Sequence, residues 1–266
     1  MITVIRYNNA KIAYRIDGEG IPLVLIHGFC EDSTIWDNFI TGLKGIKTVR
    51  PDISGFGESD LTKSNTIENM ADTIKAVLDA EDIKKCIMVG HSLGGYAALA
   101  FMKKYGNMLQ GIGLFHSSPF ADTEEKKQER LKSIHFVEKN GHIVYVKQVI
   151  PRLFAELFAS SNEFLINSLI YKASFYRTAS IISALNAMMQ RGDYADVIKD
   201  ASIPVLLIVG KLDKSIPYSV SKKMLDLPQL ADIHILSKVA HMGLFTERDN
   251  TVKAIQNFAT LCKIIG

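Results

Sequence analysis

The feature that most constrains the fold is the sequence GHSLGG at residues 90–95, because of the segments on either side of it. Residues 86–89 are all apolar and predict a buried strand. Residues 96–102 are apolar and rich in alanine, and they predict a buried helix that ends near Gly106. A strand that turns sharply into a helix at G-x-S-x-G holds its serine in a strained conformation, with the hydroxyl exposed at the edge of the sheet.

Two glycines allow such a tight turn to form. Gly90 and Gly94 have no Cβ, so the strand and the helix can approach each other closely beside the turn. The N-terminus of the helix adds partial positive charge next to Ser92, at the place where an oxyanion would form. In this setting the motif predicts a nucleophilic serine and not an ordinary turn residue.

Strand-like and helix-like patterns alternate along most of the chain. Two alternating segments, at 2–6 and 11–16, flank Asn8 and Asn9, which tolerate positive φ, and predict a hairpin. Six more strands are predicted near 21–26, 46–50, 86–89, 109–115, 203–209 and 232–236, with helices near 33–42, 66–80, 217–226 and 248–263 besides the one after the turn. This order predicts an α/β fold with a doubly wound, mostly parallel sheet of about eight strands.

Residues 119–198 interrupt the alternation, because they show helical periodicity and no strand pattern. We expect three to four helices there, with a capping box formed by Ser160 and Glu163 and a helix end at Gly192. Helices inserted between strands would cover one end of the sheet. The predicted division is an α/β core, residues 1–118 and 199–266, and an all-helical cap, residues 119–198.

Composition argues against several classes of function. The formal net charge is only +3 and no dense Lys/Arg stripe occurs, so nucleic-acid binding is not expected. No apolar run reaches the roughly 18 residues of a membrane helix, so no membrane insertion is expected. Three widely spaced cysteines indicate reduced thiols, and the N-terminal residues lack the pattern of a signal peptide. Together these observations predict a cytoplasmic protein.

Motifs for metals and cofactors are not found. The histidines are scattered and HExxH does not occur, so no metal site is expected. The sequence GFGESD at 55–60 lacks the third glycine of a dinucleotide fingerprint and is interpreted as a turn. We therefore expect no cofactor.

A serine hydroxyl needs a base to become a nucleophile, and the base needs a carboxylate to orient it. In open α/β sheets such groups gather beyond the carboxyl ends of the strands. We predict Ser92 as the nucleophile and His241, after the last strand, as general base and then acid. Asp213, after the strand at 203–209, is predicted to fix the imidazole tautomer. Asp122, which follows the preceding strand region, is the alternative acid.

An oxyanion hole requires two convergent N–H donors. The sequence HGF at 27–29 follows the first central strand, and Leu93 follows the nucleophile, so the backbone N–H groups of Phe29 and Leu93 are the predicted donors. His27 is interpreted as a structural hydrogen-bonding residue that supports this loop. Phe29 and Met242 are the predicted substrate contacts.

Taken together, these motifs closely resemble those of the α/β-hydrolase fold superfamily, in order and spacing over the whole chain. They are HGF at 27–29, PD with GFGES at 51–59, GHSLGG at 90–95, Asp213 with Pro217, and His241. The pattern is most similar to the branch of small carboxylesterases, C–C bond hydrolases and cofactor-free haloperoxidases, with a helical cap at 119–198. In haloalkane dehalogenases and epoxide hydrolases the nucleophile is Asp, so Ser92 argues against both. The resemblance implies acyl-enzyme chemistry on an ester or similar bond.

The leading hypothesis is a serine hydrolase that cleaves a small or medium carboxylic ester, with a small ester-like molecule as its substrate. Two alternatives stay open. One is a C–C bond hydrolase with the same triad, which a pocket carrying extra Arg or polar groups for a carboxylate would favour. The other is a low-turnover ligand receptor on the same fold. The oligomeric state cannot be derived from the sequence.

Overall fold

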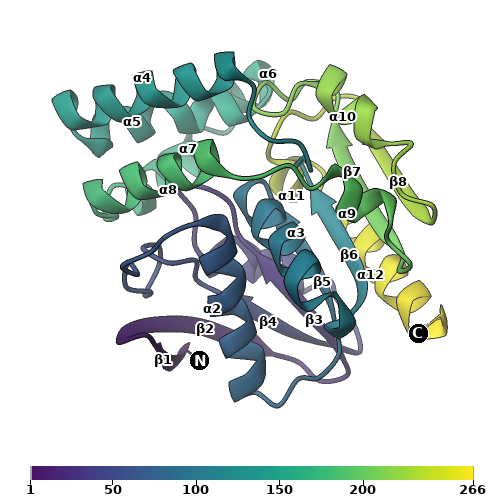
Figure 1. Ribbon diagram of the computed structural model, residues 1–266. Coiled ribbons are helices and arrows are strands. Elements are labelled where there is room, and N and C mark those ends of the chain that lie inside the picture. Colours follow the sequence, from purple (N-terminus) through teal and green to yellow (C-terminus); the bar gives the residue numbers. More distant parts are fainter. Residues whose placement is uncertain (1, 266) are drawn as a thin grey trace.

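The computed structural model describes residues 2–265, and its centre is an eight-stranded sheet in the order β1-β2-β4-β3-β5-β6-β7-β8 (Figure 1). The strands are β1 (Ile2–Tyr7), β2 (Ala10–Asp17), β3 (Ile21–Ile26), β4 (Ile46–Pro51), β5 (Cys86–His91), β6 (Leu109–Phe115), β7 (Val205–Gly210) and β8 (Ala231–Leu236). The pairs β1–β2 and β2–β4 are antiparallel, and all other neighbours are parallel. The predicted α/β class and mostly parallel sheet are confirmed.

The local sequence explains the strands well. Asn8 and Asn9 take φ of 47° and 68° in the two-residue turn of the β1–β2 hairpin, a conformation that asparagine tolerates better than most residues. Every residue of β5 and of β7 is buried, as expected for apolar runs at the centre of a parallel sheet with helices on both faces.

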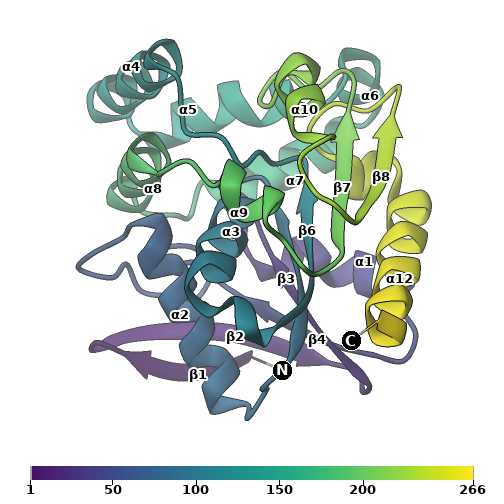
Figure 2. The same ribbon diagram turned by 45° about the vertical axis from the view of Figure 1, so that its right-hand side comes forward.

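Helices cover both faces of the sheet (Figure 2). The helices outside the cap are α1 (Asp37–Ile40), α2 (Ile67–Ala80), α3 (Leu93–Tyr105), α9 (Ala195–Lys199), α10 (Tyr218–Met224), α11 (Gly243–Thr246) and α12 (Arg248–Ile265). On one face, α3 packs against β5 and β6 and also against α2 and α9. On the other face, α12 packs against β3, β6 and β7 and contacts α1.

The segment between β6 and α9 is helical and lies over the carboxyl ends of the parallel strands (Figures 1 and 2). Its helices are α4 (Glu124–Asn140), α5 (His142–Val149), α6 (Glu156–Ser161), α7 (Glu163–Ala173) and α8 (Thr178–Gln190). These five α-helices exceed the three to four that were expected. Gly141, with φ of 81°, separates α4 from α5, and this left-handed backbone breaks what reads as one helical pattern.

The predicted capping box at Ser160 is wrong. Ser160 lies inside α6, where its hydroxyl donates to the carbonyl of Leu157 at 3.1 Å, and α7 begins at Glu163 without a side-chain cap. Gly192 does follow the end of α8, as expected. The division into core and cap at residues 118/119 and 198/199 stays a prediction, and α9, at its second boundary, packs against α3.

Within residues 2–265, no helix combines the length and the apolar character needed to cross a membrane.

Candidate active site

Ser92 stands at the turn between β5 and α3, with φ of 50° and ψ of −115°. A Cβ on Gly90 would lie 2.2 Å from the carbonyl of Gly94, so strand and helix touch where the glycines occur. The end of β6 and the segment after it hold the turn from the side, since Ser92 N donates to the Phe115 carbonyl at 2.9 Å and Ser117 Oγ donates to the Ser92 carbonyl at 2.8 Å. The strained serine is therefore supported by packing and by hydrogen bonds.

Asp213 and His241, 28 residues apart in the chain, meet Ser92 at the carboxyl edge of the sheet. His241 Nε2 lies 2.8 Å from Ser92 Oγ, and His241 Nδ1 lies 2.7 Å from Asp213 Oδ2. Asp213 Oδ1 also accepts the backbone N–H groups of Ser215 and Ile216, at 2.8 and 2.9 Å. This arrangement sets Nδ1–H toward the carboxylate and leaves Nε2 free to accept the serine proton.

Burial and charge have opposite effects on Asp213, whose side chain is only 2% exposed. Burial raises the pKa of the carboxyl, but the charge and hydrogen bond of His241 and the hydrogen bond from the Ile216 N–H lower it by more, so the net pKa is below its ordinary value. The group is therefore ionised at neutral pH, as an orienting carboxylate must be.

Two more buried histidines surround this constellation, and sequence reasoning gave them no role. His91 Nε2 donates to the His241 carbonyl at 2.9 Å, and its Nδ1 lies 3.0 Å from Glu31 Oε2. His116 Nε2 accepts the N–H of Gly243 at 3.2 Å, which leaves the ring proton on Nδ1, 3.7 Å from Asp213 Oδ2. Their only sequence signal was their position beside β5 and β6 strand ends.

The loop after β3 carries two candidate N–H donors, those of Gly28 and Phe29, and only one of them is free. Glu31 Oε2 accepts the Gly28 N–H at 2.6 Å, so that donor is occupied. The N–H groups of Phe29 and Leu93 have no acceptor among the described residues 2–265, as expected for groups that donate to an oxyanion during the reaction. His27 is fully buried and its Nε2 accepts the Ile53 N–H at 2.8 Å, consistent with the structural role expected for it.

A cavity of about 330 Å³ opens over Ser92 and His241, between the sheet and the cap. Phe29 lines it, whereas Met242 is 1% exposed and does not line it, so a substrate contact by Met242 stays a prediction without support from this cavity. The cap contributes much of the apolar wall, namely Tyr145, Val149, Ile150, Leu153, Leu185 and Met188. Leu153 also accepts the backbone N–H of His241 at 2.9 Å, which ties the cap to the candidate base.

Several charged side chains also line the cavity, and sequence reasoning missed them. The basic ones are Lys126, Arg130, Arg152 and Lys214, and the acidic ones are Glu31 and Glu129. Arg130 belongs to the charged stretch at the start of α4, a pattern that ordinarily indicates a solvent-exposed face. The only available signal was that this stretch opens the predicted cap.

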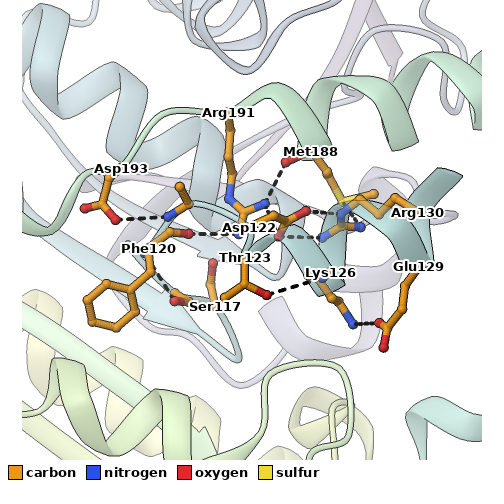
Figure 3. Close-up of polar contacts among 12 residues, drawn as sticks. Ser117, Phe120, Asp122, Thr123, Lys126, Glu129, Arg130, Met188, Arg191 and Asp193 are labelled. Atoms are coloured by element: carbon orange, nitrogen blue, oxygen red, sulfur yellow. Dashed lines mark hydrogen bonds and ion pairs between the residues drawn. The ribbon is translucent and has the colours of Figure 1, made fainter.

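Asp122, the alternative acid, has other partners than the candidate base. Its carboxylate binds Arg130 and Arg191 where the chain passes from β6 into the cap (Figure 3). Burial raises the pKa of Asp122, but hydrogen bonds and charges from the two arginines outweigh it and lower the net pKa. Asp213 is the carboxylate in contact with His241.

Comparison with known proteins agrees with this fold. The family model described as "Serine aminopeptidase, S33" matches residues 22–249, most of the chain, and the chain therefore belongs to this family of α/β hydrolases.

Individual relatives are hydrolases with different substrates. The chain is 30% identical to a pimeloyl-[acyl-carrier protein] methyl ester esterase from Wigglesworthia glossinidia brevipalpis over 216 residues, 78% of this chain and 81% of the relative. It is 24% identical to a 2-hydroxy-6-oxononadienedioate/2-hydroxy-6-oxononatrienedioate hydrolase from Pseudomonas sp, covering 94% and 92%. The solved structure of a thermophilic esterase from Thermogutta terrifontis, with malate bound, is similar with a TM-score of 0.90 and 26% identity, covering 98% and 97%.

Proposed function

We propose that this hydrolase cleaves a small or medium carboxylic ester through an acyl-enzyme formed on Ser92. The single observation that supports the proposal best is the hydrogen-bonded series Ser92 Oγ, His241 Nε2 at 2.8 Å, and His241 Nδ1 to Asp213 Oδ2 at 2.7 Å. A nucleophile, a base and an orienting carboxylate in this series are the groups that ester hydrolysis requires.

In the acylation step, Ser92 Oγ attacks the ester carbonyl carbon while His241 Nε2 takes the hydroxyl proton. The carbonyl oxygen becomes an oxyanion, which the N–H groups of Phe29 and Leu93 stabilise. The tetrahedral intermediate then expels the alcohol, and the imidazolium of His241 donates its proton to the leaving oxygen. Asp213 stabilises the imidazolium between these two transfers.

Deacylation repeats the same steps with water. His241 takes a proton from a water molecule, and the hydroxide formed attacks the acyl carbon. The bond between the acyl carbon and Ser92 Oγ then breaks, the carboxylic acid is released, and the imidazolium of His241 returns its proton to Ser92 Oγ. Each oxyanion-hole donor is worth about 2.7–4 kcal/mol of transition-state stabilisation, so the two N–H groups carry a large part of the rate.

A test of the proposal combines labelling with turnover. A fluorophosphonate probe should label the folded protein at Ser92, and Ser92→Ala should lower ester hydrolysis on the order of 10⁶-fold. A series of esters that varies in acyl length and leaving group gives the substrate range. An unlabelled Ser92 in folded protein would sink the proposal. Tight ligand binding with turnover slower than minutes across the series would instead support a receptor.

C–C bond hydrolysis by the same triad remains the second candidate. Arg130 in the cavity wall is the observation that favours it, because such substrates require a group for a carboxylate. Cleavage of a vinylogous diketone acid faster than of simple esters would favour C–C hydrolysis. Turnover of p-nitrophenyl esters without diketone cleavage would favour the esterase.

A further inference from the structure

Where the chain passes from β6 into the cap, a buried cluster of charged side chains holds more positive than negative charge. The Asp122 carboxylate lies between two guanidinium groups: Oδ2 accepts Arg130 Nε, and Oδ1 accepts Arg191 Nη1 at 2.6 Å (Figure 3). The side chains of Arg130, Asp122 and Arg191 are 13%, 3% and 4% exposed. This cluster therefore holds two positive charges and one negative charge where little water reaches them. An uncompensated buried charge is costly unless a ligand neutralises it.

Among residues 2–265, no acid other than Asp122 forms an ion pair with Arg130 or Arg191, although Glu125 and Glu129 line a cavity together with Arg130. Glu129 pairs with Lys126 at 2.9 Å, and Glu31 accepts the Gly28 N–H and faces His91. Arg191 also donates from its two terminal nitrogens to the carbonyls of Met188 and Phe120, whereas its buried Nε has no hydrogen-bond partner among the described residues. Its guanidinium lies 4.0 Å from the centre of the Tyr96 ring. The excess positive charge is thus available at Arg130.

Arg130 is the member of the cluster that lines the cavity over Ser92. It also lines a second cavity of about 580 Å³, which continues the first. Besides Arg130, the residues that line both cavities are Tyr96, Lys126, Glu129, Lys214, Ser215 and Ile216. Asp122 holds Arg130 by Nε and, at 3.4 Å, by Nη2, while Nη1 contacts the weak acceptor Met188 Sδ at 3.4 Å. The guanidinium is therefore fixed in place and still has N–H donors without an acceptor.

We propose that the substrate carries a carboxylate at the end remote from the scissile ester, and that Arg130 binds this carboxylate. The proposal rests on the ester hydrolysis proposed above and names its substrate class. A planar guanidinium can bind a carboxylate through two parallel hydrogen bonds, and Asp122 already orients the guanidinium of Arg130. Lys214 lines both cavities and makes no ion pair among the described residues, so it adds positive potential on the same path.

The test uses two methyl esters of the same chain length, monomethyl glutarate and methyl valerate. Methanol release, followed by NMR, gives kcat/KM for each. We expect the anionic ester to be preferred roughly 10- to 100-fold, the value of a charge-assisted hydrogen bond. Arg130→Gln should remove this preference, because it should lower the kcat/KM of monomethyl glutarate at least 10-fold more than that of methyl valerate, and Arg130→Lys should restore part of the preference.

The controls separate binding from folding. Arg130→Gln leaves Asp122 paired with Arg191 as a neutral pair, so the variant should fold, which its melting temperature checks. Lys127→Gln removes the same charge from an exposed neighbour on α4 that lines neither cavity, and it should keep the preference. Equal rates for the two esters in the native protein, or an equal loss of both in Arg130→Gln, would overturn the proposal.

A binding measurement keeps this result distinct from a failure of the proposed chemistry. In Ser92→Ala, calorimetry should detect monomethyl glutarate, and Arg130→Gln in that background should weaken its affinity roughly 10-fold or more. If the carboxylate binds but no ester is cleaved and Ser92 is not labelled, the proposed function fails alone. If esters are cleaved but the carboxylate gives neither binding nor preference, the substrate class fails alone.

Discussion

His91 Nε2 lies 2.9 Å from the backbone carbonyl of His241, so the residue before the candidate nucleophile holds the backbone of the candidate base. The other ring nitrogen faces Glu31, which also accepts the Gly28 N–H of the loop that carries Phe29. One buried pair thus connects the loop of the oxyanion donor, the nucleophile strand and the base. The position of each group is coupled to that of the others.

The Glu31–His91 pair predicts a pH-dependent stability. Burial alone lowers the pKa of His91, but the charge and hydrogen bond of Glu31 outweigh it, so the net pKa is raised above the ordinary value. A histidine whose pKa is raised on folding contributes to the stability of the fold. This contribution is complete at pH values below the unfolded-state pKa of about 6.5, and it is lost as the pH rises through the raised pKa of the folded state. Glu31→Gln should therefore cost about 1–3 kcal/mol near pH 6 and less at alkaline pH.

Urea unfolding at a series of pH values measures this difference. The control is Glu124→Gln, which breaks an exposed pair with Lys127 and should change stability little at any pH. A cost of Glu31→Gln that stays constant from acid to alkaline pH would contradict a charged His91.

Asp213→Asn should lower kcat on the order of 10⁴-fold with little change in KM, because an amide favours the wrong imidazole tautomer. The matched control is Asp122→Asn, the other acid considered, measured with a neutral ester. It should keep most of its kcat per folded molecule but unfold more easily, because Arg130 and Arg191 lose their counter-charge. Equal losses of kcat in the two variants would argue against Asp213 as the orienting acid.

Gly94→Ala should destabilise the fold by about 3 kcal/mol, because the added Cβ would lie 2.4 Å from the Ile26 carbonyl oxygen and 2.6 Å from that of His27. Both atoms belong to the backbone of the neighbouring strand end and cannot rotate away. Gly192→Ala is the matched control, since nothing lies within 4 Å of its added Cβ. Its stability should stay the same or rise slightly. Chemical denaturation compares the two, and a tolerated Gly94→Ala would show that the turn relaxes.

Much of the fold could be predicted because its signals are local. The central strands are short apolar runs, the hairpin has two asparagines that tolerate positive φ, and the elbow is a six-residue motif between a strand and a helix. The breaks within the cap were harder to predict. Gly141 ends α4 through its left-handed φ, and no single pattern distinguishes such a break from a glycine inside a helix.

The candidate triad could be predicted from chain order, because the ends of parallel strands share one edge of the sheet. The cavity wall could not be predicted. Leu185 and Met188 line it, whereas Phe175, another apolar residue of the cap, is 69% exposed. Which side of a cap helix faces the cavity depends on how that helix packs on its neighbours.

The sequence by itself determined the succession of strands along the chain, the sharp turn at Ser92 and the residue types available at each strand end, because these depend on neighbours within a few positions. Only the tertiary structure decided that Glu31 meets His91, 60 residues away, and that His91 meets His241, 150 residues away. It also decided that Asp122 lies between two arginines instead of beside the imidazole. The energy of such a charge pair depends on the distance between the two groups in the folded chain. The separation of two residues along the sequence hardly restricts that distance.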